Sequence, residues 1–307
     1  MHPLQRMAIS FWLAASLWLL SLPIQAEQSI LILNSNHDVE KYRAAEHAFV
    51  KTYNQTLPSI NLGEKYWTSS RVREKLYADY PDIVYAIGAK AYLAAHHFIG
   101  EKTVVFSSVV NYRRLPSNDN RYGVAQELHG GMQVMLMRHL FPNIKKLATV
   151  YSENYTAEWF KELHKQGAIV GLEVVGEAVT STAAAEQALQ RLLQNSDAAI
   201  LLSDPLLFKQ ESDFKTLLNV CDQQNKLAIG FLDALKPYGI ALIIAIDTPT
   251  TGRQAANIVK RLVAGKKPKK TVVPPAGSRL VLNLKKVRAL NATYNQAALA
   301  NVNEIIE

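Results

Sequence analysis

The chain has 307 residues, with 34 Lys or Arg, 26 Asp or Glu and a single cysteine, Cys221. One cysteine excludes an internal disulfide and any metal site built from several thiolates. The net charge of +8 describes surface and solubility and does not indicate nucleic-acid binding, and the basic run at residues 266–270 is typical of a solvated turn.

The first 26 residues have the pattern of a secretory signal peptide. Arg6 is their only Lys or Arg, an apolar run follows at residues 7–22, and Ala26 is a small residue at the cleavage site. A transmembrane anchor is the alternative, but the run is slightly short for a bilayer and Pro23 ends it. We therefore expect cleavage after Ala26 and export to the periplasm. No cysteine near Ala26 can carry a lipid anchor, so we expect a mature chain that is not embedded in the membrane, with 33 basic and 26 acidic residues.

In the first half of the mature chain, short apolar runs rich in β-branched residues alternate with helical patterns. The predicted strands are residues 29–33, 59–62, 82–87, 103–106 and 121–126, and the predicted helices cover about 42–53, 71–77 and the segment that ends at 98. Continuous apolar strands are typical of a parallel sheet that is covered on both faces. Their alternation with helices predicts βαβ units.

The alternation restarts at residue 132. The predicted strands are 147–151, 172–175, 198–202, 227–230, 239–246 and 279–283, and the predicted helices are 132–140, 156–163, 182–193, 213–222, 251–263, 284–290 and 297–306. Strands that stop at polar loops and lead into helices gather backbone N–H groups at one edge of a sheet, where open α/β sheets bind small molecules. Two such blocks predict two α/β sheets side by side, with a cleft between their strand ends.

Five segments carry a resemblance to a known family. They are residues 83–89, 140–147, 151–154, 262–268 and 280–284, the last followed by Val287 and Ala289. On these segments the chain resembles the periplasmic substrate-binding proteins of ABC transporters with the type I fold, most of all the group that includes tryptophan- and other aromatic-amino-acid-binding lipoproteins. It departs from that group at residues 107–111, where the family commonly carries Asp-Pro, and at residues 203–205, where Ser-Asp-Pro replaces the more usual Asp-Asn.

The resemblance implies an α/β protein of two Rossmann-like lobes with parallel sheets, joined by a three-segment hinge. We expect the chain to cross between lobes near residues 123–127, 247–250 and 274–278. The N-terminal lobe then comprises residues 27–122 and 250–275, and the C-terminal lobe comprises residues 123–249 and 276–307. Such a hinge lets the lobes close on a ligand when a few backbone torsions change.

The same resemblance places polar strand-end loops on facing edges of the cleft. In the N-terminal lobe the candidate ligand contacts are Asn34, Ser35, Asn36, Thr68, Ser69, Gly88, Ala89, Ser107 and Ser108. In the C-terminal lobe they are Ser152, Asn154, Tyr155, Ser203, Asp204, Phe231 and Asp233. Helix N-termini at these loops favour a carboxylate or another anionic group of the ligand.

Carboxylates and aromatic rings add two further roles at the cleft. A carboxylate can pair with a ligand ammonium group, and an aromatic ring can cover an apolar body. The candidates are Asp204, Asp233 and Asp247 for the first role, and Trp67, Tyr112, Tyr155 and Phe231 for the second. The alternatives are that a Ser or Asn only caps a helix, that an aromatic ring belongs to the core, and that Asp247 fixes the hinge.

Motifs for catalysis do not occur: the sequence has no Gly-x-Ser-x-Gly, His-Glu-x-x-His, Gly-x-Gly-x-x-Gly or Walker loop. His96 and His97 are adjacent and would point in different directions on a helix, so they cannot chelate one ion. We therefore expect no catalytic residues, no cofactor and no metal.

The expected function is that of a monomeric receptor that captures a small organic ligand, for example one like an amino acid, and presents it to an ABC permease. Two alternatives stay open. The partner can be a membrane sensor kinase or cyclase, or the chain can be an exported enzyme on an α/β scaffold.

Overall fold

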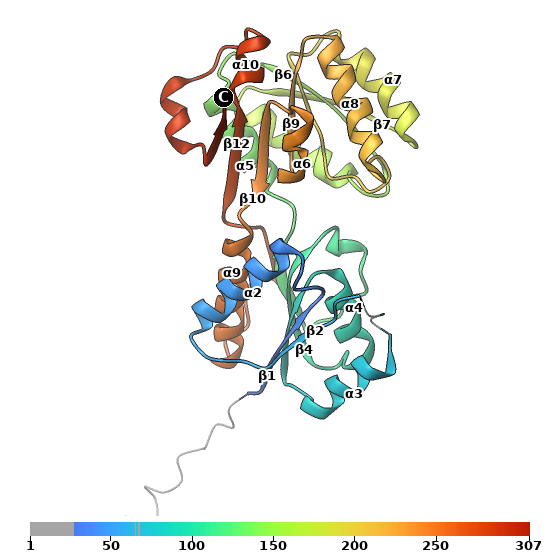
Figure 1. Cartoon of the computed structure of the whole chain (residues 1–307), viewed down its shortest axis with the longest axis vertical. Helices are drawn as coiled ribbons and strands as arrows, with labels where there is room; N and C mark the ends of the chain where they lie inside the picture. Colours follow the sequence, from blue (N-terminus) through green and yellow to red (C-terminus); the bar gives the residue numbers. More distant parts are fainter. Residues whose placement is uncertain (1–27, 65, 67) are drawn as a thin grey trace, which may run out of the picture.

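The computed structural model describes residues 28–64, 66 and 68–307, which form two lobes joined end to end (Figure 1). The expected signal peptide at residues 1–26 and the candidate ring of Trp67 lie outside the described residues. Across the described part of the chain, no helix combines the length and apolar character that a membrane crossing needs.

The N-terminal lobe is built on a parallel sheet with the strand order β11-β5-β4-β3-β1-β2. Its strands are β1 (Ile30–Asn34), β2 (Ser59–Asn61), β3 (Ile83–Ile87), β4 (Thr103–Val109), β5 (Arg121–Ala125) and β11 (Val272–Val273). Helices α2 (Glu40–Tyr53) and α9 (Thr248–Val263) cover one face, and α3 (Ser70–Asp79) and α4 (Ala89–Phe98) cover the other. The strands β1 and β3 are buried at every position, as their uninterrupted apolar sequences predict.

The C-terminal lobe has a second sheet with the order β13-β12-β10-β9-β8-β6-β7. Its strands are β6 (Lys146–Tyr151), β7 (Glu173–Ala178), β8 (Ala198–Ile200), β9 (Leu227–Gly230), β10 (Leu242–Ile246), β12 (Ser278–Asn283) and β13 (Glu304–Ile306). One face packs against α5 (Gly130–Leu140), α6 (Ala157–Ile169), α10 (Leu284–Ala289) and the 3-10 helix η3 (Gln296–Asn301). The other packs against α7 (Thr182–Leu193), α8 (Glu211–Gln223) and η2 (Asp233–Tyr238). The only antiparallel pair among the described strands is β10 with β12.

The chain passes between the lobes at residues 126–129, at Asp247 and at residues 274–277. Because β5 and β10 lead directly into crossings, their carboxyl ends face the other lobe, and so do those of the strands parallel to them. The strand ends of both sheets therefore meet at one level of the molecule. The two-lobed α/β fold expected from the sequence is confirmed.

Two of the crossings are tied to each other. The Asp247 amide donates to the Gly277 carbonyl at 3.1 Å. The side chain of Gln254 in α9 makes two more hydrogen bonds to the third crossing: Nε2 donates to the Pro274 carbonyl at 3.1 Å, and Oε1 accepts from the Ala276 amide at 2.9 Å. A Cβ at position 277 would lie 2.8 Å from Thr250 Oγ1, so only glycine fits beside the second crossing. The crossing at residues 126–129 is separate from this pair.

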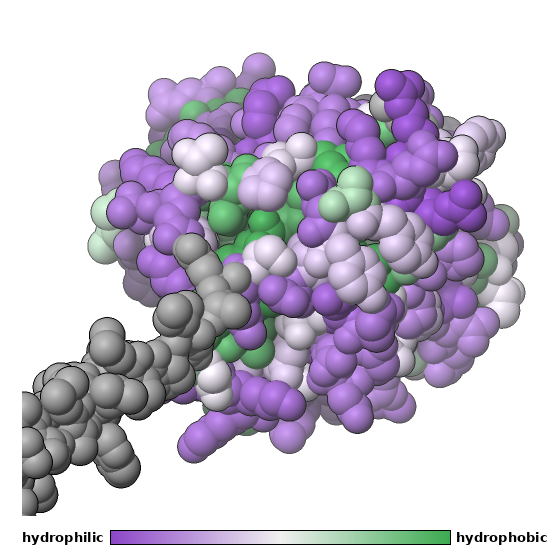
Figure 2. Space-filling view, turned by 90° about the horizontal axis from the view of Figure 1, so that it is seen from below, coloured by the Kyte–Doolittle hydropathy of each residue, from purple (hydrophilic) through white to green (hydrophobic). Residues whose placement is uncertain are grey.

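Figure 2 shows the end of the N-terminal lobe that lies farthest from the C-terminal lobe. Apolar residues gather near the middle of this face, and hydrophilic residues surround them. The strands of the first sheet start near this end and run toward the C-terminal lobe (Figure 1). This face is therefore opposite to the strand ends at which a ligand site is expected.

The sequence prediction was wrong in one element and imprecise at a boundary. Residues 297–306 were expected to be helical, but they form η3 and then β13, because the backbone of residues 304–306 pairs in parallel with β12. Residues 123–125, which the expected lobe boundary places in the C-terminal lobe, are the end of β5 in the first sheet. The short strand β11 and the 3-10 helix η1 (Tyr112–Arg114) were not expected.

Candidate functional site

Two adjoining cavities lie where the strand ends of the two sheets meet. We call them the Glu127 cavity, of about 330 Å³, and the Arg279 cavity, of about 550 Å³. Each is lined by residues from both lobes and from the crossing at residues 126–129, and Leu128, Trp159 and Ser203 line both. Together they form one inter-lobe cleft.

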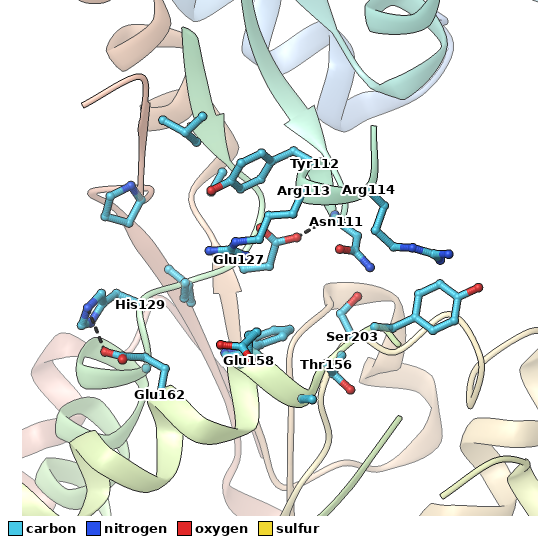
Figure 3. A pocket seen from close by; sticks show the side chains of 18 of the residues that line it. Asn111, Tyr112, Arg113, Arg114, Glu127, His129, Thr156, Glu158, Glu162 and Ser203 are labelled. Carbon is cyan, nitrogen blue, oxygen red and sulfur yellow. Dashed lines mark hydrogen bonds and ion pairs between the residues drawn. The ribbon is translucent and has the colours of Figure 1, made fainter. Parts of the chain in front are cut away.

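The Glu127 cavity has charged groups on both sides (Figure 3). The 3-10 helix η1 brings Arg113 to it from the N-terminal lobe, α6 brings Glu158 from the C-terminal lobe, and Glu127 lies between them on the crossing. Glu127 Oε1 accepts a hydrogen bond from the Asn111 amide at 2.7 Å, whereas Oε2 is buried with no partner in the described part of the chain. Burial raises the pKa of Glu127, against the opposing effects of the Asn111 hydrogen bond and of the Arg113 charge.

Side-chain contacts mark the two ends of the Glu127 cavity. At one end His129 Nε2 lies 3.2 Å from Glu162 Oε1. At the other, the guanidinium of Arg114 lies over the ring of Tyr155, 4.1 Å from its centroid. Arg114 belongs to the N-terminal lobe and Tyr155 follows β6 in the C-terminal lobe, so this second contact joins the lobes directly.

The Arg279 cavity combines cations, carboxylates and an aromatic ring. The first turn of α2 contributes Glu40 and Lys41, and the C-terminal lobe contributes Phe231, Asp233 and Arg279. Arg279 Nε donates to Asp233 Oδ2 at 3.2 Å, which holds both side chains at the cavity wall. Burial lowers the pKa of Lys41, because an ammonium group is less stable when it is removed from water.

Three buried polar atoms at the Arg279 cavity have no hydrogen-bond partner in the described part of the chain. They are Gln126 Oε1, Trp159 Nε1 and Asp233 Oδ1. Buried polar groups in folded proteins are nearly always paired, so each of these is a place for a group that the chain itself does not supply. They come from the crossing, from α6 and from η2, yet they line one cavity.

Some of the residues expected from the sequence line this cleft. Asn154 and Tyr155 line the Glu127 cavity, Phe231 and Asp233 line the Arg279 cavity, and Ser203 lines both. Tyr112 lines the Glu127 cavity and also packs on Phe106, with ring centroids 5.6 Å apart. Asp247 lines the Arg279 cavity and also caps α9 by accepting from the Thr250 amide at 3.2 Å, so both of its expected roles stay predictions.

The other expected residues do not line either cavity. These are Asn34, Ser35, Asn36, Thr68, Ser69, Gly88, Ala89, Ser107, Ser108, Ser152 and Asp204. Most of their polar groups bond within the lobes. Asn34 Nδ2 donates to Glu46 at 2.6 Å, Ser35 Oγ accepts from the Ala91 amide at 3.0 Å, and Ser107 Oγ bonds Tyr85 Oη at 2.7 Å.

Five of the side chains that define the cleft were not expected from the sequence: Arg113, Gln126, Glu127, Trp159 and Arg279. Trp159 follows the apolar spacing of a core helix, and the sequence pattern predicts that Gln126 ends a strand. The signal that could have found Gln126 and Glu127 is their place in the first expected crossing. No local pattern distinguishes Arg279, because only the antiparallel pairing of β12 with β10 brings it to the cleft.

Metal binding has no support in the described residues, where no group of three or more His, Cys, Asp or Glu side chains could hold an ion. The cleft instead offers an unpaired carboxylate oxygen, an amide oxygen and an indole N–H, with two cations close by. This set suits hydrogen bonding to a small polar molecule.

Three solved structures share this fold. A domain from Streptococcus pneumonia in complex with L-Trp is 18% identical, with a TM-score of 0.59 over 91% of this chain and 100% of that one. A conserved domain protein from Vibrio cholerae is 18% identical, with a TM-score of 0.58 over 91% and 99%. The ligand-free, open form of a substrate-binding protein with adhesive properties from Clostridium difficile is 15% identical, with a TM-score of 0.70 over 91% and 99%.

A family model agrees with these structures. No curated protein matches the chain. The model of the ABC transporter substrate binding protein family matches residues 67–306. This range includes every strand of the two sheets except β1 and β2. The chain therefore belongs to the family of ABC transporter substrate-binding proteins.

Proposed function

We propose that this protein is an exported, monomeric receptor that captures a small organic molecule in the inter-lobe cleft and presents it to an ABC permease. One observation carries the proposal: Gln126 Oε1, Trp159 Nε1 and Asp233 Oδ1 are buried, unpaired and gathered at one cavity. They come from the crossing and the C-terminal lobe, while Lys41 lines the same cavity from the N-terminal lobe. A ligand that contacts both lobes binds the closed form better than the open form, and this difference in affinity is what drives closure.

The chemistry of the Arg279 cavity favours an amino-acid-like ligand. Asp233 Oδ1 and Gln126 Oε1 are acceptors suited to an ammonium group, and the Trp159 indole donates to a carboxylate. Lys41 adds positive charge for that carboxylate, whereas the charge of Arg279 is paired with Asp233 and Glu304. Phe231 presents a ring beside Phe208 and Phe214, 6.1 Å from each, which can cover the side chain of the ligand. The L-Trp complex of the structural relative fits this ligand class.

The test is calorimetric titration of the purified protein with amino acids, nucleosides, sugars and small carboxylates. We expect saturable binding of an amino acid, together with a rise in melting temperature, because a ligand that binds only the folded state stabilises it. Gln126→Ala and Asp233→Asn should each weaken binding at least tenfold, since each removes an acceptor from the cavity. The control is Glu186→Gln, an exposed residue of α7 that lines neither cavity.

Two results would overturn the proposed function. One is that no member of the panel binds. The other is that Gln126→Ala, Asp233→Asn and Glu186→Gln bind the ligand equally well. Delivery to a permease is tested separately, by uptake of the bound ligand in cells with and without the protein.

A further inference from the structure

Arg121 is a buried cation without a buried anion. Its side chain is 2% exposed. Nη1 donates to the Lys102 carbonyl at 2.8 Å and Nη2 to the Gly100 carbonyl at 2.9 Å, while Nε is buried with no partner in the described part of the chain. None of its hydrogen bonds goes to a carboxylate of a described residue. The exposed carboxylate of Glu101 favours the charged form of Arg121, but burial has the larger effect and lowers the pKa of the guanidinium. A buried cation with no carboxylate hydrogen-bonded to it is costly.

A groove of about 820 Å³ lies beside Arg121. It adjoins the Glu127 cavity, with which it shares Tyr112, Arg113 and Val272, and it shares no lining residue with the Arg279 cavity. Four of its lining residues are cations, and Asp119 is the one carboxylate among them. We call it the basic groove, and its cations are Arg113, Arg121, Lys269 and Lys270. Lys269 and Lys270 are exposed, and they belong to the basic run that the sequence alone identifies as a solvated turn. The net charge of these five side chains favours an anion that carries more than one charge.

The β-sheet explains why these cations lie together. Val272 of β11 pairs with Gly123 of β5, and the Gly123 amide donates to the Thr271 carbonyl at 2.9 Å. The segment that carries Lys269 and Lys270 therefore leads directly into the strand beside β5. A Cβ on Gly123 would lie 2.6 Å from the ring of Phe106, so only glycine leaves room for that ring in the groove wall. Backbone pairing at the edge of the N-terminal lobe thus brings the end of the basic run next to β5, the strand that begins at Arg121.

Two more aromatic rings, and a loop that hydrogen bonds keep in place, form the rest of the groove wall. Tyr92 and Tyr112 line it with Phe106, and the Tyr92 hydroxyl donates to the Pro116 carbonyl at 2.6 Å. Asn118 Nδ2 donates to the Gly100 carbonyl at 2.9 Å, which ties the loop at residues 117–119 to the turn that also holds Arg121. Hydrogen bonds therefore hold this part of the groove wall in one arrangement.

We propose that the basic groove binds a phosphate group, carried by a small molecule or by a lipid headgroup, at a site separate from the Arg279 cavity. A phosphomonoester carries about −1.5 to −2 charges near neutral pH, which matches the excess of cations better than a single carboxylate does. Arginine and lysine both bind phosphate oxygens through charge-assisted hydrogen bonds. The three rings give the rest of the ligand a surface to pack on.

The experiment titrates the purified protein with inorganic phosphate and with 5′-AMP at low ionic strength. We expect saturable binding that is weakened at least tenfold by the double variant Lys269→Ala/Lys270→Ala. Both side chains are exposed, so this variant should fold. The matched control is Lys266→Ala/Lys267→Ala, which removes two exposed cations of the same run that do not line the groove. Gln126→Ala should leave phosphate binding unchanged, because Gln126 lines the Arg279 cavity and does not line the groove.

Sedimentation with vesicles that contain phosphatidic acid, a lipid with a phosphomonoester headgroup, identifies the source of the phosphate. Vesicle binding without binding of either soluble probe, lost in the Lys269/Lys270 variant only, assigns the groove to a lipid headgroup. Binding of a soluble probe assigns it to a small molecule. The proposal is overturned if neither the soluble probes nor the vesicles bind, or if the two double variants weaken binding equally, since the effect is then one of general charge.

Discussion

The carboxylate of Asp204 accepts hydrogen bonds from the amide and from the hydroxyl of Ser152, at 2.8 and 2.7 Å. Both residues are 2% exposed. Asp204 Oδ2 also accepts from Thr156 Oγ1, and Oδ1 accepts from the Leu206 amide at 2.9 Å. The carboxylate thus joins the loop after β8 to the turn after β6, and its oxygens are occupied by the protein itself.

Asp204→Asn should therefore lower stability more than it lowers ligand affinity. An amide in place of the carboxylate loses charge-assisted hydrogen bonds and puts an N–H group against donors, which should cost about 2–3 kcal/mol in the free energy of unfolding. Urea unfolding measures this cost. Ser203→Ala is the control. Ser203 is the residue next to Asp204, its side chain lines the cleft, and its replacement should change the free energy of unfolding little. A fully stable Asp204→Asn protein that no longer binds ligand would return Asp204 to the binding site.

All the strands except β11 and β13 were predictable, because each of them carries its own apolar signal. The sequence from Ile30 to Asn34 is apolar until its last residue, and all five positions are buried. The polar strand ends were harder to interpret, since Ser152 and Asp204 are 52 residues apart and nothing in the local sequence shows that they bond each other. For the same reason Gln126, Trp159 and Arg279 could not be grouped: a crossing, helix α6 and the pairing of β12 with β10 bring them to one cavity from distant parts of the sequence.

A close approach of two helices provides a second prediction. A Cβ at Gly252 of α9 would lie 2.1 Å from the Ala45 carbonyl oxygen of α2. Gly252→Ala should lower the free energy of unfolding by about 2 kcal/mol, because the strain of pushing the helices apart exceeds the gain in helix propensity. Gly131→Ala is the matched control, since its added methyl would meet only the side chains of Gln166 and His129, at 3.0 and 3.1 Å. Equal midpoints of urea unfolding for both variants would contradict this account of the helix pair.

The contact of Arg114 with Tyr155 leads to a third prediction, about the hinge. This cation–π contact crosses between the lobes and should contribute about 0.5–1 kcal/mol. The contact can form only while the two lobes are close together. Arg114→Ala should therefore raise the ratio of more open to less open molecules by about two- to fivefold. Spin labels on the two lobes would report longer distances in the variant. Arg43→Ala should not change them, because Arg43 pairs with Glu40 within α2. An unchanged distance distribution in Arg114→Ala would show that the contact does not limit opening.

The fourth prediction concerns the pH dependence of stability. Burial raises the pKa of Glu127 in the folded protein, whereas in the unfolded chain the carboxyl has its ordinary pKa. The folded state therefore binds this proton more tightly, and the stability that the group provides decreases as the pH rises from the ordinary pKa to the raised one. Glu127→Gln removes the buried charge but keeps an oxygen that can accept from the Asn111 amide.

The variant and the native protein should consequently have nearly the same free energy of unfolding at a pH below the ordinary pKa of Glu. Above the raised pKa the variant should be the more stable of the two. Urea unfolding of both proteins at several pH values measures the difference, and Glu186→Gln, which changes an exposed carboxylate, should show none. If Glu127→Gln is instead less stable at high pH, the attraction between Glu127 and Arg113 outweighs the penalty of burial, and the two side chains form a favourable pair across the Glu127 cavity.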